Sequence, residues 1–152
     1  MKKMIMIVMV LTMLIGGCAT SGLRFSETNI GKVPEDPEQG RVFFYRPSSF
    51  GSAIQPEVML NNEGVGEAIS WGFFYVDRPA GDYTVLIQTE VVKKCKFVLE
   101  KGHTIYIKIS SGLGFIMARI SPEIVDEVTA LDELKSLRYI GDQEIKSKEG
   151  LK

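Results

Sequence analysis

The chain has 152 residues, of which 18 are Lys or Arg and 19 are Asp or Glu, so its formal net charge at pH 7 is −1. The chain thus lacks the excess of basic residues that is typical of a nucleic-acid-binding protein, and we expect no nucleic-acid partner. With one His and two Cys, the sequence also lacks the usual ligands of a zinc site, and we expect no metal and no cofactor.

The first 17 residues have the form of an export signal. Lys2 and Lys3 precede an apolar run over residues 4–15, which two glycines then end. A membrane-spanning helix needs about 20 apolar residues, so this run is too short to cross a bilayer. It also has no polar face, which disfavours a helix at the edge of a protein core. The pattern is typical of a secretory signal peptide.

The sequence Ile15-Gly16-Gly17-Cys18 resembles the processing box of bacterial lipoproteins. The resemblance implies cleavage before Cys18, a diacylglyceryl thioether on its sulfur, and an acyl chain such as palmitate on its new amino group. The alternative is an ordinary cleaved signal with an incidental cysteine. Two or more acyl chains anchor a protein stably, whereas one chain does not. We therefore expect Cys18 to be a lipid anchor, with membrane lipid as its partner.

The residues after Cys18 bear on where such a lipoprotein is sorted. An aspartate directly after the cysteine commonly retains lipoproteins in the inner membrane, but here Ala19 and Thr20 follow. The resemblance thus favours the inner leaflet of the outer membrane, facing the periplasm. The mature chain would have 135 residues, which suits one domain. Cys95 would then have no cysteine to pair with, so no disulfide framework is expected.

Residues 18–40 are predicted to form the lipidated N-terminus and a flexible tether. The stretch contains Pro34, Pro37 and several Gly and Ser residues, and it shows no sustained hydrophobic period. A flexible chain of this length holds its ends ~25 Å apart on average. It reaches ~75 Å when fully extended. The folded domain is therefore expected to stand off the membrane, although a few tether residues could pack on it.

Residues 41–120 carry short apolar runs separated by turn residues. In the run 82–90, Tyr83, Val85 and Ile87 share one face and Thr84 and Gln88 lie on the other, as in a half-buried strand. Such runs predict an all-β fold, an antiparallel β-sandwich (immunoglobulin-like or transthyretin-like) of about eight strands, preceded by the signal peptide and the flexible tether. The predicted strands are 41–47, 56–60, 65–69, 71–76, 82–90, 94–100, 104–110 and 114–120.

One C-terminal α-helix is expected after these strands, over residues 122–138. Ser121 would cap it and Pro122 would occupy its first turn. An apolar stripe would face the sandwich, formed by Ile124, Val128, Leu131 and Leu134. The domain would thus span residues 41–140, with a polar tail over 141–152.

Several segments together resemble a family of small bacterial lipoproteins, the domain of unknown function 2846. They are "GRVFFYRP", "EVMLNNEGVGEA", "GFFYVDRPAGDYTV" and "LEKGHTIYIKI", which occur in this order within residues 40–140. The resemblance implies an envelope-associated β-sandwich without an established activity. It supplies no catalytic residues.

Two residues that often carry chemistry are better explained by structure. His103 is the lone histidine and has no acid or nucleophile beside it in sequence, so a surface turn residue is favoured over a general base. Cys95 alternates with lysines and shares its face with Phe97, which favours a buried, inert thiol. The glycines of "SSGLG" at 110–114 lack the Lys-Ser/Thr that a phosphate loop requires.

A cluster of aromatic residues offers the one candidate ligand surface. Neighbouring residues in a strand point to opposite faces, so these rings cannot all fill one core. We favour two covered faces, with a binding platform formed by Trp71 and Tyr75 as the alternative. The cluster comprises Phe43, Phe44, Tyr45, Trp71, Phe73, Phe74 and Tyr75.

Three hypotheses for function follow. The leading one is a non-enzymatic, membrane-anchored envelope lipoprotein whose sandwich contacts an envelope protein or the cell wall, with no catalytic residues. The second is a ligand- or glycan-binding module that uses Trp71 and Tyr75. The third is a small periplasmic enzyme built on His103 with Asp77 or Asp82.

Overall fold

The computed structural model describes residues 22–113 and 119–141. The predicted signal peptide, Cys18, most of the apolar run at 114–120 and nearly all of the polar tail lie outside these residues. Within the described ranges, no helix is long and apolar enough to cross a membrane.

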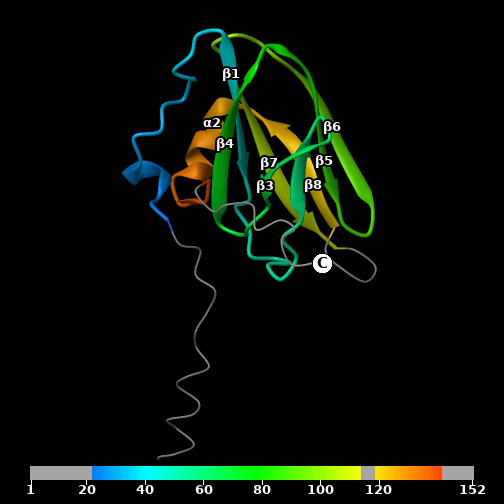
Figure 1. Ribbon diagram of the computed structural model, residues 1–152. Helices are drawn as coiled ribbons and strands as arrows, with labels where there is room; N and C mark the ends of the chain where they lie inside the picture. The colour runs from blue at the N-terminus through cyan, green and yellow to red at the C-terminus, as the bar shows by residue number, and fades with distance from the viewer. Residues whose placement is uncertain (1–21, 114–118, 142–152) are drawn as a thin grey trace, which may run out of the picture.

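The fold is a β-sandwich of two sheets, as predicted (Figure 1). One sheet has five strands in the order β8-β7-β1-β4-β9, and the other has four in the order β3-β2-β5-β6. The strands are β1 (Gln39–Tyr45), β2 (Glu57–Leu60), β3 (Glu63–Glu67), β4 (Gly72–Pro79), β5 (Gly81–Gln88), β6 (Val92–Leu99), β7 (Thr104–Gly112), β8 (Arg119–Val125) and β9 (Arg138–Tyr139).

The five-stranded sheet is mixed, whereas the sequence suggested purely antiparallel pairing. β1 pairs in parallel with β7, and β4 pairs in parallel with β9. Between β1 and β7 the chain passes through the second sheet, and this long connection allows it to return in the same direction. Both faces of β1 are buried, as is usual for a strand with a parallel neighbour.

Two apolar clusters lie on opposite faces of the five-stranded sheet. The first fills the space between the two sheets and includes Phe44 and Phe74. The second lies on the outer face, where Phe43 and Phe73 pack under helix α2 (Glu127–Leu134). Neighbouring aromatics therefore serve two different cores, which confirms the expectation of two covered faces.

The helix begins later than the sequence suggested, and two of the four residues of its predicted stripe do not face the sheet. Residues 119–125 form strand β8, in which Pro122 lies opposite Ile109. An edge strand accepts proline because one side of its backbone needs no partner. Ile124 is exposed on this strand and Val128 is 81% exposed on the helix, whereas Leu131 and Leu134 do pack on the sheet.

The N-terminal segment packs on the domain from residue 22 onward, in contrast to the expected free tether. Its 3-10 helix η1 (Phe25–Glu27) places the ring of Phe25 5.4 Å from that of Phe73, measured between centroids. The amide of Phe25 donates to the carbonyl of Leu137 at 3.0 Å. Phe25 is the single aromatic residue of the predicted tether, and its side chain packs against the apolar cluster under α2.

Candidate functional site

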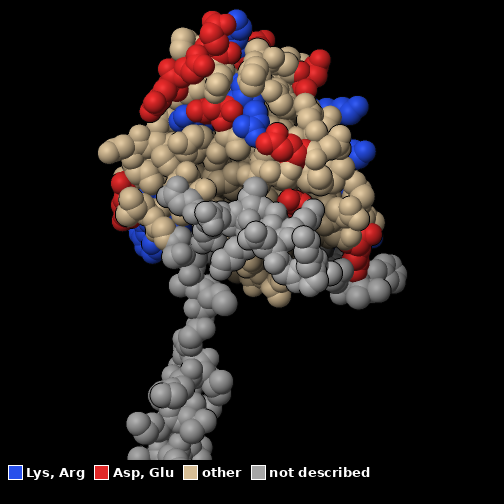
Figure 2. Space-filling view, in the orientation of Figure 1, with Lys and Arg blue, Asp and Glu red and all other residues tan. Residues whose placement is uncertain are grey.

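One end of the sandwich gathers the loops around Trp71, and we call it the Trp71 end. β1 ends at Tyr45, and its antiparallel partner β4 begins just after Trp71, so the loop 46–56 and Trp71 lie at the same end. β7 runs parallel to β1 and also ends here (lower end in Figure 1). Charged side chains are dense at the opposite, upper end in Figure 2, which includes residues 35–38 and 100–103.

Arg46 organises the loop at the Trp71 end. Its side chain is fully buried, and its guanidinium donates to four backbone carbonyls. The acceptors are the carbonyl oxygens of Ile54 (2.7 Å), Ala68 (2.8 Å), Phe50 (2.9 Å) and Gly51 (2.9 Å). Burial lowers the pKa of Arg46 from its ordinary value. Carbonyl dipoles thus take the place of a carboxylate partner, and within the described ranges no carboxylate contacts this charge.

Trp71 is held in an unusual backbone conformation with its ring in solvent. Its φ is +58°, and its side chain is 45% exposed. Both backbone polar groups are bonded: its amide donates to the carbonyl of Arg46 at 2.9 Å, and its carbonyl accepts from the amide of Arg138 at 3.0 Å. A non-glycine residue in this region costs roughly 1–3 kcal/mol, and such strain is found at functional sites. Trp71 is therefore the strongest single candidate for contact with another molecule.

The strain at Trp71 can be tested by comparing two substitutions that both remove the ring. Glycine adopts a positive φ without a Cβ clash, but alanine does not. Trp71→Gly is therefore expected to be more stable than Trp71→Ala by about 1 kcal/mol. Urea unfolding followed by circular dichroism measures the difference, and equal stability of the two variants would contradict backbone strain at this position.

Tyr75 does not form an open platform with Trp71. The guanidinium of Arg41 lies 4.1 Å above the centre of its ring, and the ring also contacts those of Phe43 and Tyr139. Arg41 in turn donates to both carboxylate oxygens of Asp77 at 2.7 Å and to the carbonyl of Gly31 at 2.5 Å. These contacts fasten the N-terminal segment to β1 and β4, so Tyr75 has a visible structural role.

The residues of the enzyme hypothesis do not form a catalytic group. His103 lies in the exposed turn before β7, with its Nδ1 3.6 Å from a carboxylate oxygen of Glu100 and 3.0 Å from the carbonyl oxygen of Lys101. Asp77 is bound by Arg41, and Asp82 pairs with Val98 in the other sheet. The carboxylate beside His103 is thus Glu100, and both side chains are open to solvent.

Cys95 lies half-buried on β6 and packs against the core between the sheets. Burial raises the pKa of its thiol, which keeps it protonated and poorly nucleophilic at neutral pH. Cys95 is thus less buried than the sequence suggested, although its side chain does face the core as expected. Among the residues that the structure describes, no group of three His, Cys, Asp or Glu side chains is placed to hold a metal ion.

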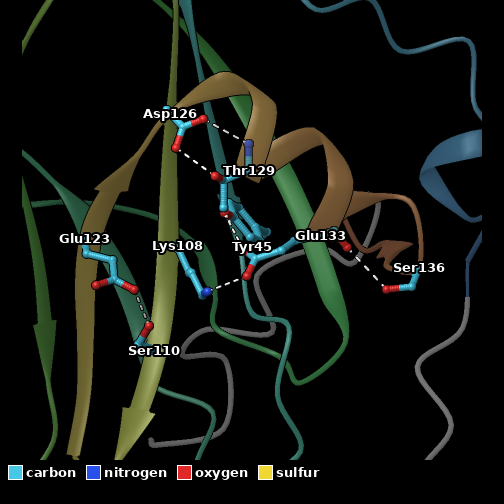
Figure 3. A network of polar contacts seen from close by, with 8 residues as sticks. All are labelled: Tyr45, Lys108, Ser110, Glu123, Asp126, Thr129, Glu133 and Ser136. Atoms are coloured by element: carbon cyan, nitrogen blue, oxygen red, sulfur yellow. Dashed lines mark hydrogen bonds and ion pairs between the residues drawn. The ribbon is translucent and has the colours of Figure 1, made fainter.

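A polar network that the sequence did not suggest joins α2 to the sheet (Figure 3). The hydroxyl of Tyr45 donates to Glu133 at 2.8 Å, and Lys108 donates to the other oxygen of the same carboxylate at 2.5 Å. Burial and the bond to Glu133 raise the pKa of Tyr45 above its ordinary value. Burial likewise raises the pKa of Tyr106 to about 12. Both phenols stay protonated at neutral pH, and the network fastens the helix to the sheet.

Asp126 caps α2 and offers a pH-dependent test of this helix (Figure 3). Its carboxylate accepts from the amide of Thr129 at 3.0 Å and from its hydroxyl at 2.7 Å, which lowers the pKa of Asp126 below the ordinary 3.8. A lowered folded-state pKa stabilises the protein above the unfolded value, and this contribution is lost as the pH falls. Asp126→Ala should therefore be less stable than wild type at pH 7, and the gap should narrow below pH 3.8.

Thermal melts of both proteins between pH 7 and pH 3 measure this gap. Asp132→Ala is the control, because its ion pair with Lys135 is exposed and contributes little. A gap for Asp126→Ala that stays constant across this range would contradict a role for the ionised carboxylate.

The described residues thus define a small β-sandwich domain with one covering helix. The profile of the family described as "Protein of unknown function (DUF2846)" matches residues 36–119, more than half of the chain, and the chain belongs to this family. An uncharacterized protein of Haemophilus influenzae is 25% identical over 119 residues, which cover 76% of this chain and 71% of that protein. No solved structure matches the chain.

Proposed function

We propose that this protein is a membrane-anchored lipoprotein of the bacterial envelope whose β-sandwich acts as a non-enzymatic interaction domain. The sequence Ile15-Gly16-Gly17-Cys18 at the end of the apolar run carries the proposal. An acylated Cys18 would fix the chain to a bilayer, with the outer membrane as its expected location. The family description is compatible with this proposal and names no reaction.

The arrangement of polar side chains supports an interaction domain over an enzyme. Three clusters of hydrogen-bonded polar side chains lie around Arg41, Arg46 and Glu133, and each connects one part of the fold to another. Catalysis instead needs a base or nucleophile placed beside a reacting group. Crosslinking in intact cells from a photoreactive residue at the exposed position Val98 should capture an envelope protein or wall polymer. Capture of neither would count against the interaction role.

The anchor is tested by Cys18→Ser. Wild-type protein should stay in the membrane fraction after a high-salt wash, and mass spectrometry should find a mature N-terminus at Cys18 with the added mass of acyl chains. The variant should lack this mass, because serine has no thiol to alkylate. A Cys18→Ser protein that is processed normally and still resists the salt wash would overturn the lipoprotein proposal.

A further inference from the structure

Exposed apolar side chains gather at the Trp71 end. This end contains the loop 46–56, Trp71 and the end of β7. It also contains the turn from β5 to β6, because β5 is antiparallel to β2 and its last residues lie beside the first residues of β2, which follow the loop 46–56. Half of the ten large hydrophobic residues that are exposed in the described ranges lie in these segments. They are Phe50, Trp71, Val91, Val92 and Leu113, the last being 84% exposed.

The N-terminal segment is fixed to this same end. Arg138 joins the two, because its amide donates to the carbonyl of Trp71 at 3.0 Å and its Nη1 donates to the carbonyl of Gly22 at 2.7 Å. The amide of Tyr139 also donates to the carbonyl of Leu23 at 2.8 Å. The path from Cys18 to the domain therefore ends at Gly22, beside Trp71.

The length of that path limits how far the domain can stand from a membrane. Four residue steps separate Cys18 from Gly22, and a fully extended chain covers at most ~14 Å over them. The headgroup layer of one leaflet is itself roughly 5–8 Å thick. An acylated Cys18 would therefore leave the Trp71 end less than about 10 Å beyond the headgroups.

We infer that the Trp71 end rests on the lipid surface, with Trp71 and its apolar neighbours in the headgroup layer. This inference rests on the proposed anchoring at Cys18. Tryptophan favours this layer because its ring is apolar while its N–H still finds a polar partner. The strained backbone at Trp71 keeps the ring exposed, and exposed Leu113 and Phe50 extend the apolar contact beside it.

The distribution of acidic residues agrees with this orientation. Glu35, Asp36, Glu38 and Glu100 are exposed at the opposite end, which would face away from the bilayer (Figure 2). At the Trp71 end Glu57 is exposed, whereas Glu67 and Glu90 are half-buried. Bacterial leaflets that contain anionic lipid would repel the acidic end and tolerate the apolar one.

The fluorescence of Trp71 tests the inference directly, since it is the single tryptophan of the chain. The mature chain from residue 18, with Cys95→Ala, is coupled through Cys18 to maleimide-bearing phosphatidylethanolamine in phosphatidylcholine vesicles. This coupling supplies the anchor whether or not cells acylate Cys18. We expect the emission of Trp71 to be blue-shifted on the vesicles, and acrylamide to quench it less than in solution. Brominated acyl chains should quench it about twofold.

Three variants of the coupled protein complete the test. Phe50→Ser and Leu113→Ser, singly or combined, should restore much of the acrylamide access and reduce the quenching by brominated lipid. Val98→Ser, at an exposed apolar position away from this end, should behave as wild type.

Two results would overturn the inference. One is emission on vesicles that equals emission in solution and is not quenched by brominated lipid. The other is equal quenching in the wild-type, Phe50→Ser, Leu113→Ser and Val98→Ser proteins, because a short link without apolar docking would give that result. Both are independent of the Cys18→Ser experiment in cells, so failure of the docking and failure of the anchor are distinguished.

Discussion

Arg46→Met should lower the free energy of unfolding by about 3–5 kcal/mol, because several buried hydrogen bonds to one charged group are lost together. The guanidinium donates to four carbonyls from two separate segments, and these carbonyls would be left buried without a donor. Hydrogen bonds to charged groups contribute roughly 1.5–3 kcal/mol each, but bonds to one group do not add. Methionine fills a similar volume and restores none of these bonds. Urea unfolding of the mature chain measures the change.

Arg78→Met is the matched control for this prediction. Arg78 also contacts an acceptor, a carboxylate oxygen of Glu63 at 3.0 Å, but both side chains reach solvent. Exposed ion pairs contribute about 0–1 kcal/mol. Arg46→Lys should recover little stability, because an ammonium group has three donors and cannot span four carbonyls. Equal losses for Arg46→Met and Arg78→Met would show that the buried contacts do not stabilise the loop.

The strands could be predicted because their signals are local. Alternation placed Val85 and Ile87 on the buried face of β5, and both are fully buried. The turn at Asn61 and Asn62 also follows from composition, since asparagine tolerates the positive φ of 48° and 68° found there. The positions of most strands could therefore be predicted from the polar turn residues that separate the apolar runs.

The start of the helix could not be predicted, because the same residues satisfy two patterns. Pro122 suits the first turn of a helix and also an edge strand. Ile120 and Pro122 alternate inward as a strand requires, and pairing with β7 decides the outcome. The true cap is Asp126, five residues after the predicted Ser121, and it begins a helix of eight residues.

The candidate site depends on contacts between segments far apart in sequence. Nothing near Arg46 indicates that its side chain turns inward to bind the carbonyls of residues 50–68. Trp71 would share the outer face with Phe73 in a regular strand, but its positive φ directs the ring to solvent. The link from Gly22 through Arg138 to Trp71 spans more than 100 residues of chain. Composition and periodicity carry no information about such links.

The packed N-terminal segment changes what the anchor would do. A free tether of 22 residues would let the domain search a wide shell above the membrane, and its orientation would be random. With an acylated Cys18, attachment at Gly22 would instead select one end of the sandwich for the bilayer and would present the charged end to the periplasm. An interaction partner would then meet the charged end and the outer face of the four-stranded sheet. This orientation depends on the contacts that hold the segment in place.

Phe25→Ala should release that segment and lower the free energy of unfolding by about 2–3 kcal/mol. Its ring meets those of Phe43 and Phe73 edge to face, with centroids 6.1 Å and 5.4 Å away. Because Phe25 is only partly buried, the loss should fall below the 3–5 kcal/mol of a fully buried phenylalanine. Trypsin should also cleave after the exposed Lys32 faster than in wild type, since the backbone around it is freed.

Leu23→Ala is the control, because Leu23 is 60% exposed and should change stability by no more than about 0.5 kcal/mol. If Phe25→Ala neither weakens the fold nor speeds cleavage, Phe25 does not hold the segment and the domain is free to move away from its anchor.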